Sequence, residues 1–316
     1  MTHLKSADFL EILRGFVFER VLSEDSVAHN ISVLGTLSPG SSDSPSQAIV
    51  RIERTALSGD FSKLLRDTLE NVKLIESTDI YSWLLAWFTK HHDVPDAKIN
   101  IICPATEVHI RKYSSQSIIM VRETPELYEK IVKPFIQAFP PSRTHWVENI
   151  LTGVSEAEKV LYRDDSPETG FLILPDMKWD LTNISTLYLV ALSLNRKIRS
   201  LRDLNRHHLL MLKNIRREAS RIVKERWGLE KGSLRFYVHY QPSYYHFHVH
   251  IVNSNYVGFP GMNVGQAHLL EDLISLIELG EPSAPCILER ITLSYGLGDQ
   301  HGLFEKMKSA QENLEQ

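Results

Sequence analysis

The chain has 316 residues, a length typical of two domains, and its 43% apolar and 23% charged residues allow each half to bury a core of its own. A formal net charge of -4 excludes the global basic field that attracts long nucleic acid. The 2 cysteines exclude a disulfide framework, and no apolar run has the length of a signal peptide or a membrane span, so we expect a protein of the cytoplasm, and also of the nucleus, without membrane association.

The first third of the chain has the pattern of a small α+β domain. A cluster of Gly, Pro, Ser and Asp at 38–47 predicts a loop, and the β-branched run 48–57 after it predicts a strand. Residues 61–78 have helical spacing but equally fit a strand with a turn. The short apolar run 97–106 predicts a further strand. We place the end of this domain at residue 115.

The remainder predicts a larger domain of helices and strands. An acidic start and apolar residues every three or four positions favour a helix over 124–139, ended by Pro140 and Pro141. Asp203 and Gly228 are the expected N-cap and stop of a long helix, whose basic side we interpret as a solvated face. The other expected elements are a segment at 146–153, a strand at 170–176, a strand or core helix at 186–194, and two strands, 234–240 and 244–252, joined by Gln241, Pro242 and Ser243.

The most informative segment is 246–252, which reads His-Phe-His-Val-His-Ile-Val. Side chains alternate between the two faces of a strand, so we expect His246, His248 and His250 to line one face while the apolar residues between them enter the core. The upstream strand brings His239 within reach of the same surface. The sequence therefore predicts a cluster of imidazoles.

Three interpretations of this cluster compete. A purely structural role is the least favoured, because crowding makes each imidazole harder to protonate. A His-x-His pair can chelate zinc, but no paired cysteine or Glu-x-x-His motif completes such a site. In the third, a neutral imidazole attacks phosphorus and forms a phosphohistidine while its neighbours stabilise the phosphate oxygens. This chemistry needs neither a metal nor a glycine-rich phosphate loop, so we expect no cofactor.

The segment 246–252 fits the motif of the histidine-triad superfamily, and its surroundings resemble the scavenger mRNA decapping enzymes. The resemblance is dense in the second domain and thinner in the first. It is carried by the runs 239–252, 170–180 and 198–204, by Trp146 ahead of Glu156, and by the runs 77–83 and 103–113. The implied fold is α+β, with a small N-terminal α+β domain (1–115) and a histidine-triad domain (116–316) built on an antiparallel sheet with flanking helices.

By this resemblance the middle histidine, His248, is the nucleophile, and His246 and His250 flank it. The implied substrate contacts are Trp146, Glu156, Asp176, Met177, Lys178, His239, Ser243 and Tyr244, with Arg111 or Lys112 reaching the phosphate bridge. If 176–178 is extended, Met177 faces away from Asp176 and Lys178. The chain departs from the family at Gln266, where an arginine is usual.

The implied roles agree with the chemistry of a methylated cap. N7-methylation leaves a positive charge on guanine, on which the indole of Trp146 can stack with cation–π support. The carboxylate of Glu156 can accept charge-assisted hydrogen bonds from the base, and Lys178 is a compact charge suited to a polyphosphate.

The resemblance also implies an activity and an assembly. The activity is hydrolysis of the triphosphate bridge of 7-methylguanosine cap dinucleotides and short capped RNA fragments, which releases 7-methylguanosine monophosphate. The assembly is a homodimer that exchanges its N-terminal domains, which also close over the sites as lids. Two other functions stay open: a histidine-triad hydrolase of other nucleotides, which would not need Trp146 and Glu156, and a cap-binding regulatory relative with weak catalysis.

Overall fold

The computed structural model describes residues 6–38, 44–55, 65–77, 80–89, 95–257, 260–281 and 283–314. The chain folds as two compact units, Met1–Gln116 and Ser117–Gln316. Helices and antiparallel sheets occur in both, so the expected α+β class is confirmed. The assignment of a dimerisation and lid role to the first unit stays a prediction. None of the described helices combines the length and the apolar character that crossing a bilayer requires.

The first unit is built around a four-stranded antiparallel sheet. Its strands lie in the order β1 (Val17–Asp25), β2 (Asn30–Leu37), β3 (Ser46–Arg54) and β6 (Ala97–Ile102). Ile110 of the helix α3 (Glu107–Tyr113) packs into a core with Leu22, Leu34 and Ile49 of the sheet. The strands expected at 48–57 and 97–106 are therefore confirmed.

Two further elements belong to the described part of this unit. The helix α1 spans Ser6–Arg14, and a separate hairpin pairs β4 (Leu69–Ser77) with β5 (Ser82–Phe88). Of the two alternatives for 61–78, the strand holds over Leu69–Ser77, whereas residues 65–67 form a short helical turn. Residues 61–64, and much of the loop expected at 38–47, lie outside the described residues.

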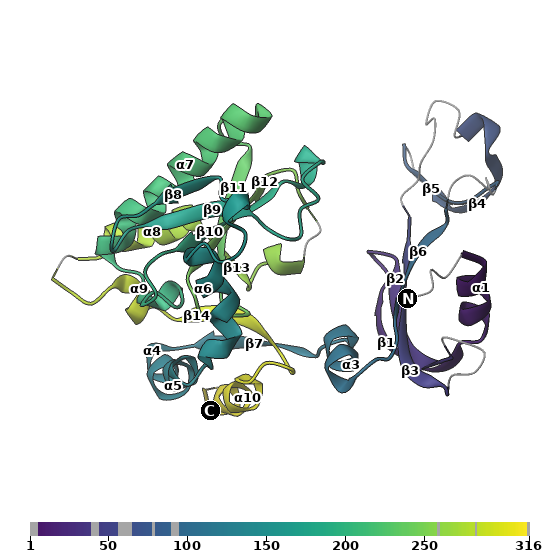
Figure 1. The fold of residues 1–316 in the computed structure, drawn as a ribbon, viewed down its shortest axis with the longest axis horizontal. Helices are drawn as coiled ribbons and strands as arrows, with labels where there is room; N and C mark the ends of the chain where they lie inside the picture. Colours follow the sequence, from purple (N-terminus) through teal and green to yellow (C-terminus); the bar gives the residue numbers. More distant parts are fainter. Residues whose placement is uncertain are drawn as a thin grey trace. The chain divides into compact units, whose positions relative to one another are not determined.

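The second unit is built on a six-stranded antiparallel sheet (Figure 1). Its strands lie in the order β13 (Ala267–Leu269), β11 (Leu234–His239), β12 (His248–Asn253), β10 (Tyr188–Ser193), β9 (Phe171–Pro175) and β8 (Tyr162–Asp164). The helices α7 (Leu209–Trp227) and α8 (Leu270–Leu279) bury one face of it. On the other face, α6 (His145–Leu151) packs against Leu172, Leu174, Val190 and Leu192. The run 186–194 is thus a strand.

Shorter elements surround this sheet. A two-stranded ribbon pairs β7 (Ile118–Glu123) with β14 (Leu293–Gly298). The remaining helices are α4 (Pro125–Leu127), α5 (Lys133–Gln137), α9 (Ile287–Arg290) and α10 (Phe304–Leu314), with a π-helical turn at Tyr128–Val132 and 3-10 turns at Pro141–Thr144, Ala157–Lys159, Ile184–Thr186, Leu201–Asp203, Arg206–His208 and Pro260–Met262. The helix expected over 124–139 therefore exists, with a π-helical turn inside it.

Two expectations are wrong in detail. Asp203 does not cap α7: its carboxylate accepts the backbone N–H groups of Arg199 and Ser200 and closes a 3-10 turn, and α7 begins only at Leu209. Its expected end at Gly228, in a left-handed conformation, is confirmed. The two strands around the histidines are joined by residues 240–247 rather than by three residues, so β12 begins at His248 and not at residue 244.

A buried ion pair ties the ribbon to the 3-10 turn Leu201–Asp203. The guanidinium of Arg202 donates to Oε1 of Glu123 from Nε at 3.0 Å and from Nη2 at 2.7 Å, and both side chains are 0% exposed. Its Nη1 donates to the carbonyls of Leu288 and Ile291. Glu123 also accepts the hydroxyls of Tyr240 at 2.7 Å and Tyr295 at 2.8 Å, so every charged group of the pair is satisfied.

We predict that Glu123→Gln lowers the free energy of unfolding by about 3–5 kcal/mol, because it leaves the buried guanidinium of Arg202 without its counter-charge. Urea unfolding at neutral pH measures this loss. The matched control is Glu129→Gln, whose partner Lys133 lies at 2.8 Å on an exposed helix face, and it should cost only about 0.3–0.5 kcal/mol. Equal losses for the two variants would contradict the importance of the buried pair.

Candidate active site

Strand β12 places two of the expected histidines in one cavity. His248 pairs with Leu192 and His250 with Val190 of β10, and all four line the same cavity. Val249 and Ile251, between and beyond them, are 0% exposed in the core on the opposite face. The alternation expected from the sequence therefore holds for these two histidines.

His246 is placed differently from the expectation, and the prediction that it shares a strand face with the other two is wrong. It precedes β12, and the N–H of the next residue, Phe247, donates to the carbonyl of Ile198, which is not part of the sheet. The ring nitrogen Nε2 of His246 donates to the carbonyl of Ser193 at 2.8 Å. The side chain is buried and does not line the cavity that holds His248.

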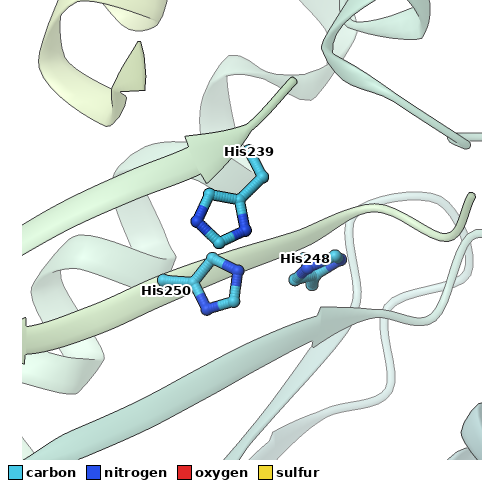
Figure 2. Close-up of side chains that lie close together, drawn as sticks. All are labelled: His239, His248 and His250. Atoms are coloured by element: carbon cyan, nitrogen blue, oxygen red, sulfur yellow. The ribbon is translucent and has the colours of Figure 1, made fainter. Parts of the chain in front are cut away.

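A third imidazole in the cavity comes from the end of β11. The ring centroids of His239 and His250 lie 4.2 Å apart, and those of His248 and His250 lie 4.8 Å apart (Figure 2). Nε2 of His239 donates to the carbonyl of Gly261 at 2.8 Å. Burial lowers the pKa of His239 and, more strongly, that of His250. All three rings are therefore neutral at pH 7.

The hydrogen bond of His248 defines which of its nitrogens can react. Nδ1 lies 2.7 Å from the carbonyl oxygen of His246. A carbonyl can only accept, so Nδ1 carries the proton and Nε2 holds the lone pair. Burial lowers the pKa of His248 to about 3, so the lone pair stays available at neutral pH. This is the state that a nucleophilic imidazole requires.

Aromatic side chains form one wall of this cavity, whose volume is about 520 Å³. The ring of Tyr244 stacks on that of His248, with centroids 4.3 Å apart and planes at 11°. Trp146, from α6, meets Tyr244 edge-on at 4.9 Å and is 45% exposed. Part of the indole is therefore open to a flat ligand.

Polar groups also line the cavity. Glu156 is one of them, in a left-handed conformation (φ 57°), with Lys159 at 3.3 Å from its carboxylate. Asp176 accepts the backbone N–H of Lys178 at 2.9 Å, so 176–178 is a tight turn and not the extended segment considered from the sequence. As a result Asp176, Met177 and Lys178 all line the cavity, with Met177 95% exposed.

Most of the expected contact residues therefore lie together, and others were missed. Ser243 and Tyr244 line the cavity from the 240–247 connection. Gln266, which the sequence marks as a departure from the family, lines it too. Further lining residues that the sequence did not single out as ligand contacts are Gln241, Gly296 and the apolar Ile150, Leu174, Pro175, Val190 and Leu192. Only the apolar ones carried a signal, as the second face of the strands at 170–176 and 186–194. Arg111 and Lys112 belong to α3 of the first unit, and their proposed reach stays a prediction.

The three imidazoles also have to be tested as a metal site. Nitrogens of His239, His248 and His250 lie within 4.8 Å of one another, and three imidazoles are a ligand number that zinc sites use. Nε2 of His248 and Nδ1 of His239 hold lone pairs, because the other nitrogen of each ring donates to a carbonyl. His248 and His239 therefore each keep one nitrogen that could bind a metal. The expectation that no metal is needed stays a prediction.

Comparisons with known proteins agree with the resemblance found in the sequence. Residues 11–116 match the family model of the scavenger mRNA decapping enzyme (DcpS) N-terminal domain, and residues 145–264 match that of the C-terminal binding domain of the same enzyme. The chain is similar to the m7GpppX diphosphatase of Schizosaccharomyces pombe, at 37% identity over 96% of this chain and 97% of that protein. It is also similar to the m7GpppX diphosphatase of Rattus norvegicus, at 34% identity over 94% of this chain and 87% of that protein. The enzyme of the same name from Caenorhabditis elegans is 31% identical over 94% of this chain and 91% of that protein.

We predict that the stability of the chain falls as the pH is lowered from 7 to 5. The pKa of His248 is about 3 in the folded chain and about 6.5 when unfolded, so the unfolded chain binds more protons in this interval. The expected cost is about 2 kcal/mol for one such buried imidazole. Urea unfolding at pH 7 and at pH 5 measures the fall in the free energy of unfolding. In His248→Asn this fall should be smaller by about 2 kcal/mol than in the unaltered protein. Equal losses in both proteins would contradict a neutral, buried His248.

Proposed function

The chain belongs to the scavenger mRNA decapping enzyme family, and from that membership we propose that it hydrolyses the triphosphate bridge of 7-methylguanosine cap dinucleotides and short capped RNA fragments. The observation that carries the proposal is the position of His248. Its ring is neutral, its Nε2 lone pair is free of the backbone, and it lines the same cavity as Trp146 and Glu156. A nucleophile for phosphorus and groups suited to a cationic base therefore share one site.

The proposed reaction has two steps. Nε2 of His248 attacks the phosphorus nearest 7-methylguanosine, and the bond from that phosphorus to the bridging oxygen breaks. The leaving group is a nucleotide or oligonucleotide with a 5′-diphosphate, and a phosphohistidine remains on the enzyme. A water molecule then attacks the phosphohistidine, releases 7-methylguanosine monophosphate and restores the neutral imidazole. The carbonyl of His246 holds the proton of Nδ1, which fixes the ring for both steps.

The shape and charge of the cavity support recognition of the cap. The exposed part of Trp146 offers a flat face to the methylated base, and Glu156 offers a carboxylate to its edge. Among the described residues that line the cavity, Lys178 is the one lysine and no arginine occurs. A triphosphate carries more charge than one lysine balances, which supports the further contribution from Arg111 or Lys112 that the family resemblance implies.

Product analysis tests this proposal. We expect the purified, EDTA-treated protein to release 7-methylguanosine monophosphate from a methylated cap dinucleotide and to cleave the unmethylated twin much more slowly, because the reaction uses no metal and the uncharged base loses its cation–π contact. The matched variant His248→Asn should bind the methylated compound without turnover.

Each other outcome has a defined meaning. Equal cleavage of the two compounds would remove the cap-specific pocket and favour a hydrolase of other nucleotides. Binding without cleavage by the unaltered protein would favour a regulatory cap-binding protein. Loss of activity on chelation with recovery in zinc would replace the nucleophile by a metal centre. Residual turnover by His248→Asn would remove His248 as the nucleophile.

We also propose that the chain works as a homodimer. An isolated two-stranded hairpin is only marginally stable in water, and the hairpin β4–β5 carries many half-exposed apolar side chains. They include Val72 (47% exposed), Leu74 (56%), Ile75 (63%), Trp83 (48%), Leu84 (50%), Leu85 (49%) and Trp87 (48%). A second copy of the chain, as the family resemblance implies, would cover them.

Sedimentation analysis at micromolar concentration should give twice the mass of one chain. Leu84→Lys should weaken the dimer at least about tenfold, because a charge on the covered face must lose its water. Val27→Lys is the control, since Val27 is 89% exposed in the turn between β1 and β2 of the same unit, and it should leave the mass unchanged. A monomeric unaltered chain would refute the assembly.

A further inference from the structure

His250 lies in an aromatic cage that the proposed reaction does not explain. The ring of Tyr237 stacks on it with centroids 5.1 Å apart and planes at 23°, and the ring of Tyr188 meets it edge-on at 5.7 Å. Strand pairing produces this arrangement. Tyr237 of β11 lies directly opposite His250. On the other side, the direct partner of His250 is Val190 of β10, and Tyr188 lies two residues before Val190, diagonally across from His250. The cage is therefore held by three neighbouring strands of the sheet.

Two hydroxyls of the cage form a chain that ends on His250. The hydroxyl of Tyr237 donates to that of Tyr188 at 3.3 Å, and the oxygen of Tyr188 lies 2.9 Å from Nδ1 of His250. Burial raises the pKa of both tyrosines above the usual range, so both hydroxyls keep their protons. Since the oxygen of Tyr188 accepts from Tyr237, its own hydrogen is directed to Nδ1 of His250. Nδ1 is then the nitrogen with the lone pair.

The other nitrogen of the ring is buried without a partner. Nε2 of His250 makes no hydrogen bond with any described residue, and His250 lines the cavity beside His248. Buried polar groups in proteins are nearly always hydrogen-bonded, so an orphaned one in a ring that lines a cavity points to a ligand atom that completes it. A group that carries its proton on Nε2 can complete it only with an acceptor, such as a phosphate oxygen.

We propose that Tyr188 is a positioning residue that holds His250 with its proton on Nε2, opposite to the tautomer of His248. The two neighbouring rings then present complementary groups to one phosphoryl group. Nε2 of His248 offers a lone pair to phosphorus, and Nε2–H of His250 donates to a non-bridging oxygen of that phosphorus. If His250 had the tautomer of His248, its lone pair would repel that oxygen.

A backbone carbonyl and a tyrosine hydroxyl therefore select opposite tautomers in two chemically identical side chains. The carbonyl of His246 selects Nδ1–H in His248, because it can only accept. The hydroxyl of Tyr188 selects Nε2–H in His250, because its hydrogen is already directed to Nδ1. Neither selection requires a charge, so the donor and the nucleophile coexist as neutral rings. The catalytic consequence rests on the proposed phosphoryl transfer, whereas the tautomers do not.

The tautomers can be measured directly in the full-length protein. Long-range proton–nitrogen correlation spectra of the imidazoles, with His250 assigned from His250→Gln, should show the proton on Nε2 of His250 and on Nδ1 of His248. A proton on Nδ1 of His250 in the unaltered chain would overturn the proposal. This readout needs neither substrate nor turnover, so it stands even if the cap is not cleaved.

The variant Tyr188→Phe keeps the ring and removes the hydroxyl. We expect the His250 spectrum to show the loss of the single tautomer, and kcat for the methylated cap dinucleotide to fall by about 10–100-fold with a much smaller change in KM. Tyr256→Phe is the matched control. The ring of Tyr256 lies 6.5 Å from that of Tyr188, but its hydroxyl does not take part in the hydrogen bonds from Tyr237 through Tyr188 to His250. It should change neither readout. An unaltered tautomer and kcat in Tyr188→Phe would overturn the positioning role.

Discussion

The buried ion pair between Glu123 and Arg202 is the constraint on which the geometry of the second unit depends. Both side chains are withdrawn from water, so each would be costly without the other. Arg202 donates to two backbone carbonyls near α9, and the carboxylate of Glu123 gathers Tyr240, Gln241 and Tyr295 around itself. One carboxylate thereby joins the ribbon β7–β14, a 3-10 turn and the connection that precedes β12.

That connection extends the hydrogen-bond network to the candidate active site. It begins at Tyr240 and Gln241, which are bound to Glu123, and ends where the N–H of Phe247 donates to the carbonyl of Ile198. Between these anchors it places Tyr244 on the face of His248. It also orients the carbonyl of His246 that receives the proton of His248. The proposed nucleophile is therefore positioned by a loop that hydrogen bonds hold at both ends.

The sequence predicted those features that arise from local periodicity. The alternation through 246–252 predicted the core face of β12 and the placement of His248 and His250, because a strand has a period of two. The same rule failed for His246, because β12 begins only at His248, while His246 and Phe247 hydrogen-bond to the carbonyls of Ser193 and Ile198. Asp203 failed as a helix cap for a similar reason: a side chain that can cap a helix can equally close the 3-10 turn before it.

The features that the sequence could not predict are long-range. Glu123 and Arg202 are 79 residues apart, and neither stands in a pattern that marks it as buried. Gln266 and Gly296 reach the cavity only through the packing of β13 and β14, and no local motif reports that packing.

Burial itself is the most consequential of these features. A triphosphate is strongly anionic, and a nearby anion favours the protonated form of an imidazole. In the proposed reaction, protonation would remove the lone pair with which His248 attacks phosphorus. Because burial holds the pKa of His248 at about 3, the substrate would have to raise it by about four pH units before the nucleophile was lost at neutral pH. The buried position of the histidines therefore makes a metal-free attack on a polyanion chemically consistent, at the cost in stability that their neutral state imposes in acid.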